Sequence, residues 1–289
     1  MTDNFNEINP ILSVKNLTKR YETFTLKGVS FELEKGKITG FIGRNGAGKT
    51  TTLKSLFNLV HPDAGDVEIF NLPFSRNELE IKGRVGFVLG AANYYPNKKI
   101  KTITNAAKGF YKKWDDNAYR DYLAKFSLDE NKTISKLSSG MKVKYALALA
   151  LSHRAEILIL DEPTSGLDPV SRDEILGLFL DLSEQGITIL FSTHITSDLD
   201  YCADNIIYIK EGEIIAHDKL DNFVGGYQIH EFLKKDVPVD LLNKAIGHRR
   251  TKNGVSLLFR KDACSISGGK TVKVDLDAIM VHIEKENGQ

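Results

Sequence analysis

Near the start of the chain, apolar and polar residues alternate with the two-residue period of half-buried strands. The alternation covers Ile11–Tyr21 and Val29–Glu34, around a turn-like Leu26-Lys27-Gly28, and predicts two antiparallel strands. Farther along, Ile157–Leu160 is a continuous apolar run, which is typical of a central strand in a parallel sheet. Another strand is predicted at Ile187–Phe191.

The middle of the chain follows the longer period of helices. The pattern predicts a helix over Thr50–Asn58 and a largely helical stretch from about Leu89 to Ser152. We interpret that stretch as a helical arm. Its last helix follows Met141 and gathers apolar residues on one face, namely Val143, Ala146, Leu147, Ala150 and Leu151.

The pattern changes after about Phe223, where Gly225-Gly226 interrupts it. We therefore expect a main domain over 1–223 and an accessory domain over 224–289. In the latter, Val239–Ile246 predicts a helix, and a hairpin around Lys252-Asn253-Gly254 leads into a strand at Val255–Phe259.

A final helix is predicted from the spacing of its apolar residues. Leu276, Ile279, Met280 and Ile283 recur at i, i+3, i+4 and i+7, which gives the helix one apolar face. Packing of that face on the accessory domain itself is the default expectation, and a contact with a partner is the alternative.

A glycine-rich segment between a predicted strand and a predicted helix carries the most specific chemistry. Gly43–Thr50 reads Gly-Arg-Asn-Gly-Ala-Gly-Lys-Thr, follows the β-prone Lys37–Ile42 and opens the helix. Such a loop turns its backbone N–H groups around the phosphates of a nucleoside triphosphate. Lys49 is expected to reach the β- and γ-phosphates, and the Thr50 hydroxyl to bind Mg²⁺.

Acidic residues follow the apolar strand in the second half of the chain. Ile157–Leu160 is followed by Asp161-Glu162-Pro163. In P-loop enzymes, acidic residues at the carboxyl end of a strand bind Mg²⁺ or activate water. Downstream, His194 ends the strand predicted at Ile187–Phe191. A lone histidine at such a position is usually structural.

Between these motifs lies Leu137-Ser138-Ser139-Gly140-Met141, just before the last helix of the arm. With the phosphate loop and the acidic strand in this order, the chain resembles the ATP-binding cassette (ABC) proteins over residues 11 to about 222. The resemblance implies an α/β P-loop NTPase fold with a RecA-like mixed sheet, an antiparallel β subdomain and a helical subdomain, here followed by a small α+β appendage.

The resemblance also assigns roles to individual residues. It implies that Glu162 is the catalytic base, that His194 senses the γ-phosphate, and that Thr50 and Asp161 bind Mg²⁺. Tyr21 would stack on adenine, although an ordinary strand aromatic is the alternative. The residues expected to bind ATP are Tyr21, Gly43, Asn45, Gly46, Ala47, Gly48, Lys49, Thr50, Thr51, Ser138, Ser139, Gly140 and Asp168.

In this family Ser138–Gly140 completes the site of an opposite subunit, so a second ABC ATPase subunit is an expected partner. The full set of motifs permits a homodimer, and a heterodimer stays open. ATP would be held between two subunits, with the N-terminus of the helix after Ser138 directed at the γ-phosphate. Hydrolysis would remove that bridge and open the dimer.

The sequence departs from the family pattern at two places. Gly90 stands where the family has a glutamine that reaches Mg²⁺ and water, and Asn93 either substitutes for it or has no metal role. Tyr94-Tyr95-Pro96 beside it is either a docking surface or a local packing element. The second departure lies in Leu137–Met141, which corresponds to the signature motif of the family. It has Ser139 and Met141 in place of the usual glycine and glutamine, and Gly140 preserves close approach at the helix N-terminus.

Together with Phe110–Asp115 and with Ala146–Ser152 followed by His153, these variants resemble a Gram-positive branch of ABC exporters. That branch includes ATPases like those of acetoin-operon transporters and of the phenol-soluble-modulin exporters. This resemblance implies an ABC-2-type membrane permease as a partner and an amphipathic peptide as a possible cargo. The expected function is therefore ATP hydrolysis that drives an exporter.

Composition limits the alternatives. Among 289 residues, 39 basic and 38 acidic side chains leave a net charge of +1, so no nucleic-acid partner is expected from overall charge. The two cysteines, Cys202 and Cys264, suit a reducing compartment. No long apolar window or leader is evident, so we expect a cytoplasmic protein that lies on the inner face of the cell membrane through its permease.

Two rival functions remain at this point. A soluble single-cassette ATPase that acts in assembly is one, since the chain has neither the long coiled coil nor the second cassette of other non-transport relatives. The other is a regulatory module that binds ATP and scarcely hydrolyses it, which the missing glutamine supports and Glu162 opposes.

Overall fold

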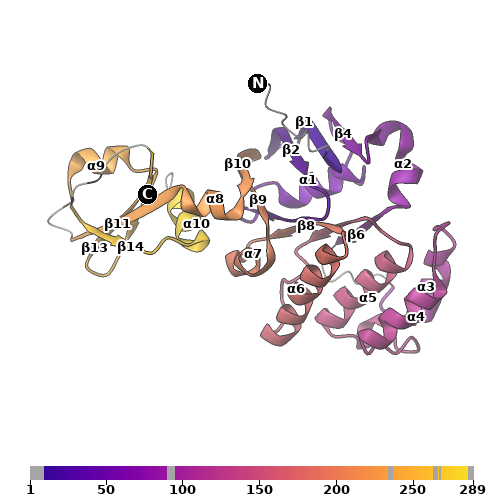
Figure 1. Ribbon diagram of the computed structural model, residues 1–289. Coiled ribbons are helices and arrows are strands. Elements are labelled where there is room, and N and C mark those ends of the chain that lie inside the picture. Colours follow the sequence, from indigo (N-terminus) through magenta and orange to yellow (C-terminus); the bar gives the residue numbers. More distant parts are fainter. Residues whose placement is uncertain (1–9, 90–94, 234–236, 263–265, 267, 286–289) are drawn as a thin grey trace, which may run out of the picture. The chain divides into compact units, whose positions relative to one another are not determined.

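The computed structural model describes residues 10–89, 95–233, 237–262, 266 and 268–285, and the chain forms two compact units (Figure 1). The first is Met1–His217 and the second is Asp218–Gln289. The division therefore precedes the boundary at Phe223 that the glycine pair suggested, and α8 (Leu220–Gly225) belongs to the second unit. No helix in the described part of the chain is long and apolar enough to cross a membrane.

A six-stranded sheet in the order β10-β9-β3-β8-β7-β6 is the centre of the first unit. Neighbours from β9 to β6 pair in parallel. Every residue of β3, β7 and β8 is buried, as the continuous apolar run Ile157–Leu160 predicts for β7. The strands are β3 (Ile38–Ile42), β6 (Val85–Leu89), β7 (Ile157–Asp161), β8 (Thr188–Thr193), β9 (Asn205–Lys210) and β10 (Glu213–Lys219).

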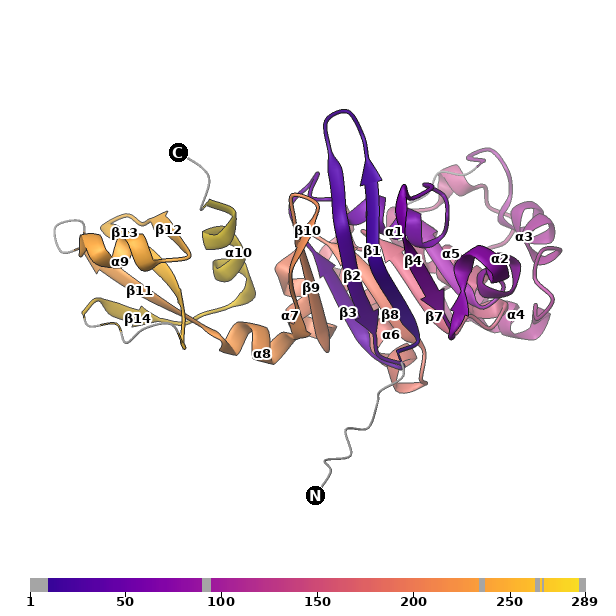
Figure 2. The same ribbon diagram turned by 90° about the horizontal axis from the view of Figure 1, so that it is seen from above.

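Helices and a second sheet cover the two faces of this central sheet. In Figures 1 and 2, α1 (Lys49–Leu56) and the antiparallel strands lie on one face, and α5 (Ser139–Ser152), α6 (Pro169–Glu184) and α7 (Thr196–Cys202) lie on the other. The arrangement is a layered α/β fold, as the sequence indicated.

The antiparallel sheet has the order β2-β1-β4-β5, built from β1 (Leu12–Arg20), β2 (Thr25–Leu33), β4 (Ala64–Ile69) and β5 (Leu72–Pro73). The turn predicted at Leu26-Lys27-Gly28 is wrong. The chain reverses earlier, where the Tyr21 N–H donates to the Phe24 carbonyl at 2.8 Å. Gly28 instead has φ of 65° at an irregularity in the register of β1 with β2, so the glycine marks a bulge inside the strand.

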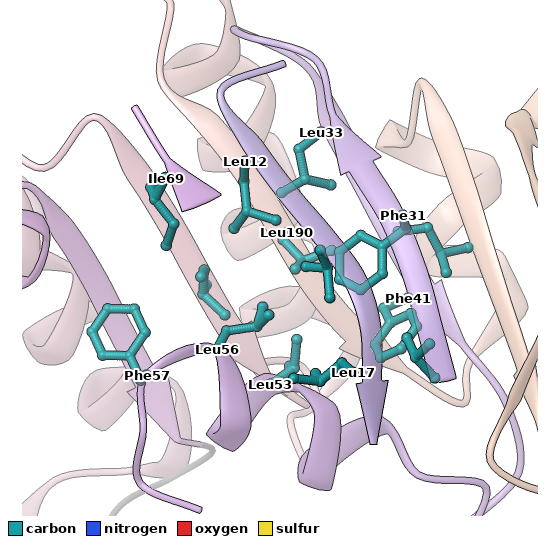
Figure 3. Close-up of a cluster of buried hydrophobic side chains, with 14 of the residues drawn as sticks. Leu12, Leu17, Phe31, Leu33, Phe41, Leu53, Leu56, Phe57, Ile69 and Leu190 are labelled. Atoms are coloured by element: carbon teal, nitrogen blue, oxygen red, sulfur yellow. The ribbon is translucent and has the colours of Figure 1, made fainter. Parts of the chain in front are cut away.

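One hydrophobic core joins the layers of the first unit (Figure 3). Side chains from the antiparallel strands and from α1 meet side chains from the central sheet and exclude water from all three, which is the main stabilising term of such a fold. Its members include Leu12, Leu17, Phe31, Leu33, Phe41, Leu53, Leu56, Phe57, Ile69 and Leu190.

The helical arm packs its own elements through a small buried polar network. The Thr104 hydroxyl lies 2.8 Å from the Tyr119 hydroxyl and 2.9 Å from the Tyr145 hydroxyl, so α3, α4 and α5 are held together where polar groups must be paired. The arm contains α3 (Ile100–Lys108), α4 (Asp116–Lys125), the 3-10 helix η1 (Ile134–Lys136) and α5, and α2 (Phe74–Lys82) precedes β6.

The second unit has a four-stranded antiparallel sheet in the order β12-β13-β11-β14. The apolar face of α10 (Leu276–Lys285) is buried against this sheet, which confirms the default expectation for the final helix. The other elements are β11 (Tyr227–Leu233), α9 (Val239–Lys244), β12 (Gly247–Arg250), β13 (Gly254–Arg260) and β14 (Lys270–Val272).

Candidate functional site

The phosphate loop connects β3 to α1 at the carboxyl edge of the parallel sheet. Gly43 must be a glycine here, because a Cβ would lie 2.3 Å from the Ile209 carbonyl oxygen. Gly48 has φ of 116° immediately before α1, a conformation that favours glycine. The loop therefore fits close against the sheet and leads into the positive end of a helix.

Lys49 lies inside this loop and is almost fully buried. Its ammonium group donates to the Gly43 carbonyl at 2.7 Å and to the Arg44 carbonyl at 3.3 Å. It also lies 3.5 Å from the Glu162 carboxylate. A buried ammonium needs such partners, and the phosphates of a nucleotide would provide stronger ones.

Asp161 is the last residue of β7 and Thr50 lies in the first turn of α1, and their side chains meet at the carboxyl edge of the central sheet. The Thr50 hydroxyl lies 3.1 and 2.9 Å from the two Asp161 carboxylate oxygens. A third group, the Ser192 hydroxyl, donates to Asp161 at 2.6 Å. A hydroxyl and a carboxylate side by side are oxygen ligands of the kind that Mg²⁺ prefers.

This pair fits Mg²⁺ better than a metal held by protein alone. Among the described residues no group of three or more His, Cys, Asp and Glu side chains could hold a metal ion. Mg²⁺ in nucleotide sites uses only one or two protein ligands together with phosphate and water oxygens. The expectation for Thr50 and Asp161 is consistent with that chemistry.

Glu162 follows directly and lies beside His194. The Nδ1 atom of His194 is 2.9 Å from a Glu162 carboxylate oxygen, so Nδ1 carries the proton that is shared between them. Glu162 has φ of 50°, an uncommon value for a residue with a side chain. Its N–H donates to the Ser192 hydroxyl at 2.9 Å, which holds the residue in this strained conformation.

Lys49, Thr50 and Glu162 line a pocket of about 440 Å³ in the first unit, and Asp161 and His194 contact these residues without belonging to the described lining. Tyr21 lies at its margin and is 45% exposed, so its ring is accessible to a flat ligand. Asn45, Gly46 and Thr51 also line the pocket. The full lining is Tyr21, Thr23, Phe24, Asn45, Gly46, Gly48, Lys49, Thr50, Thr51 and Glu162.

The signature residues are placed differently. Ser138 caps α5, where its hydroxyl accepts from the Met141 N–H at 3.2 Å, and Ser139 and Gly140 open the helix. Asp168 caps α6, and its hydrogen bond from the Ser171 hydroxyl lowers the pKa of its carboxyl. None of Ser138, Ser139, Gly140 and Asp168 belongs to the described lining of the pocket.

Two polar residues beside the site were not identified from the sequence. Ser192, in β8, contacts both Asp161 and Glu162 as described above. Asp198, in α7, is fully buried and accepts from the hydroxyls of Thr164 at 2.6 Å and Thr193 at 3.2 Å. The Arg172 guanidinium pairs with the same carboxylate, so the segment after Glu162 is tied to α6, β8 and α7.

The segment that departs from the family pattern is described in part. Gly90, Asn93 and Tyr94 lie outside the described residues. Tyr95 is 69% exposed and Pro96 is exposed as well, so Tyr95 is not packed into the core.

Comparison with known proteins decides the family. The model of the ABC transporter family matches residues 26–165. The bacitracin transport ATP-binding protein BcrA of Bacillus licheniformis is 36% identical over 222 residues, which cover 74% of this chain and 72% of the relative. The chain belongs to the ABC transporter ATP-binding proteins. It is an ABC ATPase that hydrolyses ATP.

Other relatives of this ABC ATPase include the lantibiotic transport ATP-binding protein SrtF of Streptococcus pyogenes, 32% identical, with 73% of this chain and 92% of the relative covered. Among solved structures, the ATP-binding cassette MJ0796, described as a dimer in a post-hydrolysis state with ADP and Pi, is 26% identical. It matches with a TM-score of 0.65 over 72% of this chain and 98% of its own. The layered fold is thus that of the ABC cassette.

Proposed function

We propose that this ABC ATPase is the energy-supplying subunit of an exporter and works with a membrane permease of the ABC-2 type. The observation that carries the proposal is the convergence of five side chains at the phosphate loop. Lys49, Thr50 and Glu162 line the pocket, Asp161 contacts Thr50, and His194 contacts Glu162. The names of similar proteins, which concern transport of bacitracin and of a lantibiotic and export of Nod factor, support a role in export.

In the proposed reaction each side chain has a separate task. Lys49 and the loop N–H groups bind the β- and γ-phosphates of ATP and balance their charge. Glu162 orients the attacking water and accepts its proton. His194 fixes Glu162 through the contact at its Nδ1 atom and contacts the γ-phosphate.

The Thr50 hydroxyl and the Asp161 carboxylate, which lie side by side, would hold Mg²⁺. When bound, it neutralises charge on the phosphates. Ser192 would keep the Asp161 carboxylate in place, because its hydroxyl donates a hydrogen bond to that group that is separate from the one donated by Thr50.

We further propose that two cassettes enclose ATP between them. Ser138 and Gly140 lie at the N-terminus of α5 and outside the pocket of their own chain, so a second subunit is needed to bring them to a γ-phosphate. The dimeric structure described for MJ0796 supports this arrangement. The protein would then lie on the inner face of the cell membrane through its permease.

The cargo in this proposal is an amphipathic peptide, as in the phenol-soluble-modulin exporters that the sequence resembles. The finer placement in a Gram-positive exporter branch agrees with similarity to a linearmycin resistance ATP-binding protein of Bacillus subtilis, 32% identical over 213 residues. The alternative is a single-cassette ATPase that acts in assembly or regulation and has no permease.

The reaction is tested with Glu162→Gln, which keeps the size of the side chain and removes its basic carboxylate. We expect ATP turnover to fall by roughly 100-fold or more, while ATP and Mg²⁺ still produce a dimer in light scattering. Glu184→Gln, at an exposed position at the end of α6, is the matched control and should turn over ATP normally. Equal turnover by Glu162→Gln and Glu184→Gln would refute the assigned base.

The transport role needs a separate experiment. The chain is cross-linked in its native cells, isolated, and its partners are identified by mass spectrometry. A partner with several membrane-spanning segments supports the exporter. Soluble partners alone, from a preparation shown to contain membrane proteins, would favour the assembly factor instead.

A further inference from the structure

The second unit contains a pocket of about 410 Å³ whose lining is rich in basic side chains. It lies beside α10 and over one face of the sheet. The register places Arg249, Ser256, Glu231 and Lys270 in one row across the four strands. Residues opposite one another in register point to the same face of a sheet, so these four side chains form a polar strip on the face of the sheet that α10 covers.

The neighbouring row of residues on the same face is apolar and limits the pocket on one side. Gly247, Leu258, Ile229 and Val272 are partners across the same four strands, and three of them are buried. Gly247 lies so close to α10 that a Cβ there would be 2.1 Å from the His282 carbonyl oxygen. The helix therefore covers the apolar row and Ser256 of the polar row, and leaves Arg249, Glu231 and Lys270 exposed.

The floor of the pocket is a fixed polar pair. The Ser256 hydroxyl lies 2.8 Å from Nε2 of His282, and both residues are more than nine-tenths buried. The His282 Nδ1 atom donates to the Ala278 carbonyl at 2.6 Å, so in the neutral ring Nε2 accepts and the serine donates. Burial, assisted by the charges of Arg249 and His248, lowers the pKa of His282.

Charge in the pocket is strongly one-sided. Arg249, Arg250, Lys252 and Lys273 line it, against Glu231 as the acidic member. Within the described residues none of these four basic side chains forms an ion pair. In the first unit, by contrast, exposed lysines such as Lys27 and Lys37 do have acidic partners, each within 3.0 Å.

The hairpin turn holds part of this charge in place. The Thr251 N–H donates to the Gly254 carbonyl at 2.9 Å, and the Gly254 N–H donates to the Thr251 hydroxyl at 3.1 Å. Lys252 lies inside that closed turn. The positive groups are thus displayed from a rigid hairpin and a sheet, which reduces the entropy lost when they bind a ligand.

We propose that this pocket binds a phosphate-bearing anion through Arg249, Lys252 and Lys273. Arginine presents a planar fork that matches phosphate oxygens, and lysine adds a compact charge. A ligand with two negative charges or more would relieve the mutual repulsion of the basic side chains. The phosphate group can belong to a soluble phosphate compound or to the headgroup of an anionic phospholipid. This site is independent of the proposed exporter function.

The test uses the full chain with its nucleotide site filled by a non-hydrolysable ATP analogue and Mg²⁺. Pyrophosphate is titrated while the ring signals of ¹³C-labelled histidines are followed by NMR. His282, one of seven histidines, is assigned with Ser256→Ala, which removes the partner of its Nε2 atom. We expect a saturable shift of the His282 signals and a rise in its pKa, because an anion nearby favours the protonated ring.

A double variant and a matched control decide the outcome. Arg249→Gln with Lys273→Gln should weaken binding by about tenfold or more, since each lost charge-assisted contact has a large effect on affinity. Lys244→Gln with Lys261→Gln removes the same charge from exposed positions outside the pocket and should change binding less than about twofold. Circular dichroism confirms that both variants fold.

A second arm identifies the source of the phosphate. Sedimentation with phosphatidylglycerol vesicles is compared with phosphatidylcholine vesicles, for both double variants. Binding to the anionic vesicles alone, lost in the Arg249 and Lys273 double variant, assigns the site to a headgroup, whereas a response to pyrophosphate alone assigns it to a soluble ligand. No saturable response to either probe, or equal responses of the two double variants, would overturn the proposal.

Discussion

Removal of the buried Asp198 carboxylate is the most direct test of how the segment after Glu162 is held. This side chain is fully buried and accepts from the hydroxyls of Thr164 and Thr193, and Arg172 pairs with it. Thr164 follows Glu162 by two residues and Thr193 precedes His194, so one carboxylate anchors the segment after Glu162 and the segment before His194. Asp198→Ala should therefore reduce both stability and ATP turnover.

The expected size of the effect follows from what the substitution leaves behind. Two hydroxyls that are about 1% exposed lose their acceptor, and the guanidinium of Arg172, with 25% of its side chain exposed, loses its counter-charge. Breaking a buried ion pair from one side costs roughly 3–5 kcal/mol. Because Arg172 retains some water contact, we expect a loss of about 3 kcal/mol for Asp198→Ala and about half of that for Asp198→Asn, which keeps an acceptor oxygen.

The assay can be made specific to the first unit. Trp114 is the one tryptophan of the sequence and lies in the helical arm, so its fluorescence during urea unfolding reports on that unit. Asp181→Asn is the matched control, because Asp181 is 58% exposed and lies 3.5 Å from Lys125. Such a surface pair contributes less than about 1 kcal/mol. If Asp198→Ala destabilised no more than Asp181→Asn, the anchoring argument would be refuted.

Three further predictions concern pH, the phosphate loop and the adenine site. Burial lowers the pKa of His153 to about 4, so the unfolded chain binds the extra proton first as pH falls, and this residue should reduce the free energy of unfolding by about 2 kcal/mol between about pH 7 and about pH 5. His153→Phe, which can keep the stack on Tyr111, should make urea unfolding less dependent on pH in that window; an unchanged slope would contradict the buried neutral ring. Gly43→Ala should weaken ATP binding by on the order of tenfold or more in calorimetry, because a Cβ would collide with the Ile209 carbonyl, whereas Gly177→Ala, with open space in α6, should bind ATP normally and gain about 0.5–1 kcal/mol of stability. Tyr21→Ala should weaken ATP binding by about 1–3 kcal/mol, the usual worth of a base stacked on an aromatic ring, while Tyr21→Trp should retain it; equal affinity of the two variants would exclude stacking.

The parts of the fold that could be predicted are those with a strong local signal. Ile157–Leu160 is apolar at every position, and Ile187–Phe191 at every position but Thr188, because β7 and β8 are buried on both faces. The phosphate loop is equally explicit, since its glycines satisfy steric needs that are visible at Gly43 and Gly48. For these elements the sequence pattern and the tertiary structure demand the same residues.

The missed features depend on contacts between distant segments. A glycine such as Gly28 signals a turn or a bulge equally well, and only the pairing of β1 with β2 selects the bulge. Ser192 and Asp198 are ordinary polar residues in the sequence and become important because β8 and α7 bring them to Asp161 and Thr164. The polar row of the second unit likewise arises only when four strands, separated along the chain, are placed in register.

The position of Asp161 beside Thr50 and Ser192 depends on the register of the central sheet. Asp161 is the register partner of Ser192 across β7 and β8, and it shares the face of Ile157 and Ile159, which pack in the core with α1. A slip of one residue in β7 would turn Asp161 to the opposite face, away from Thr50 and Ser192. There the carboxylate would be buried without these donors, at a cost of several kcal/mol. The polar groups at the strand ends therefore help to select the register of an otherwise uniformly apolar strand, so the same contacts that prepare the site for ATP also specify the fold around it.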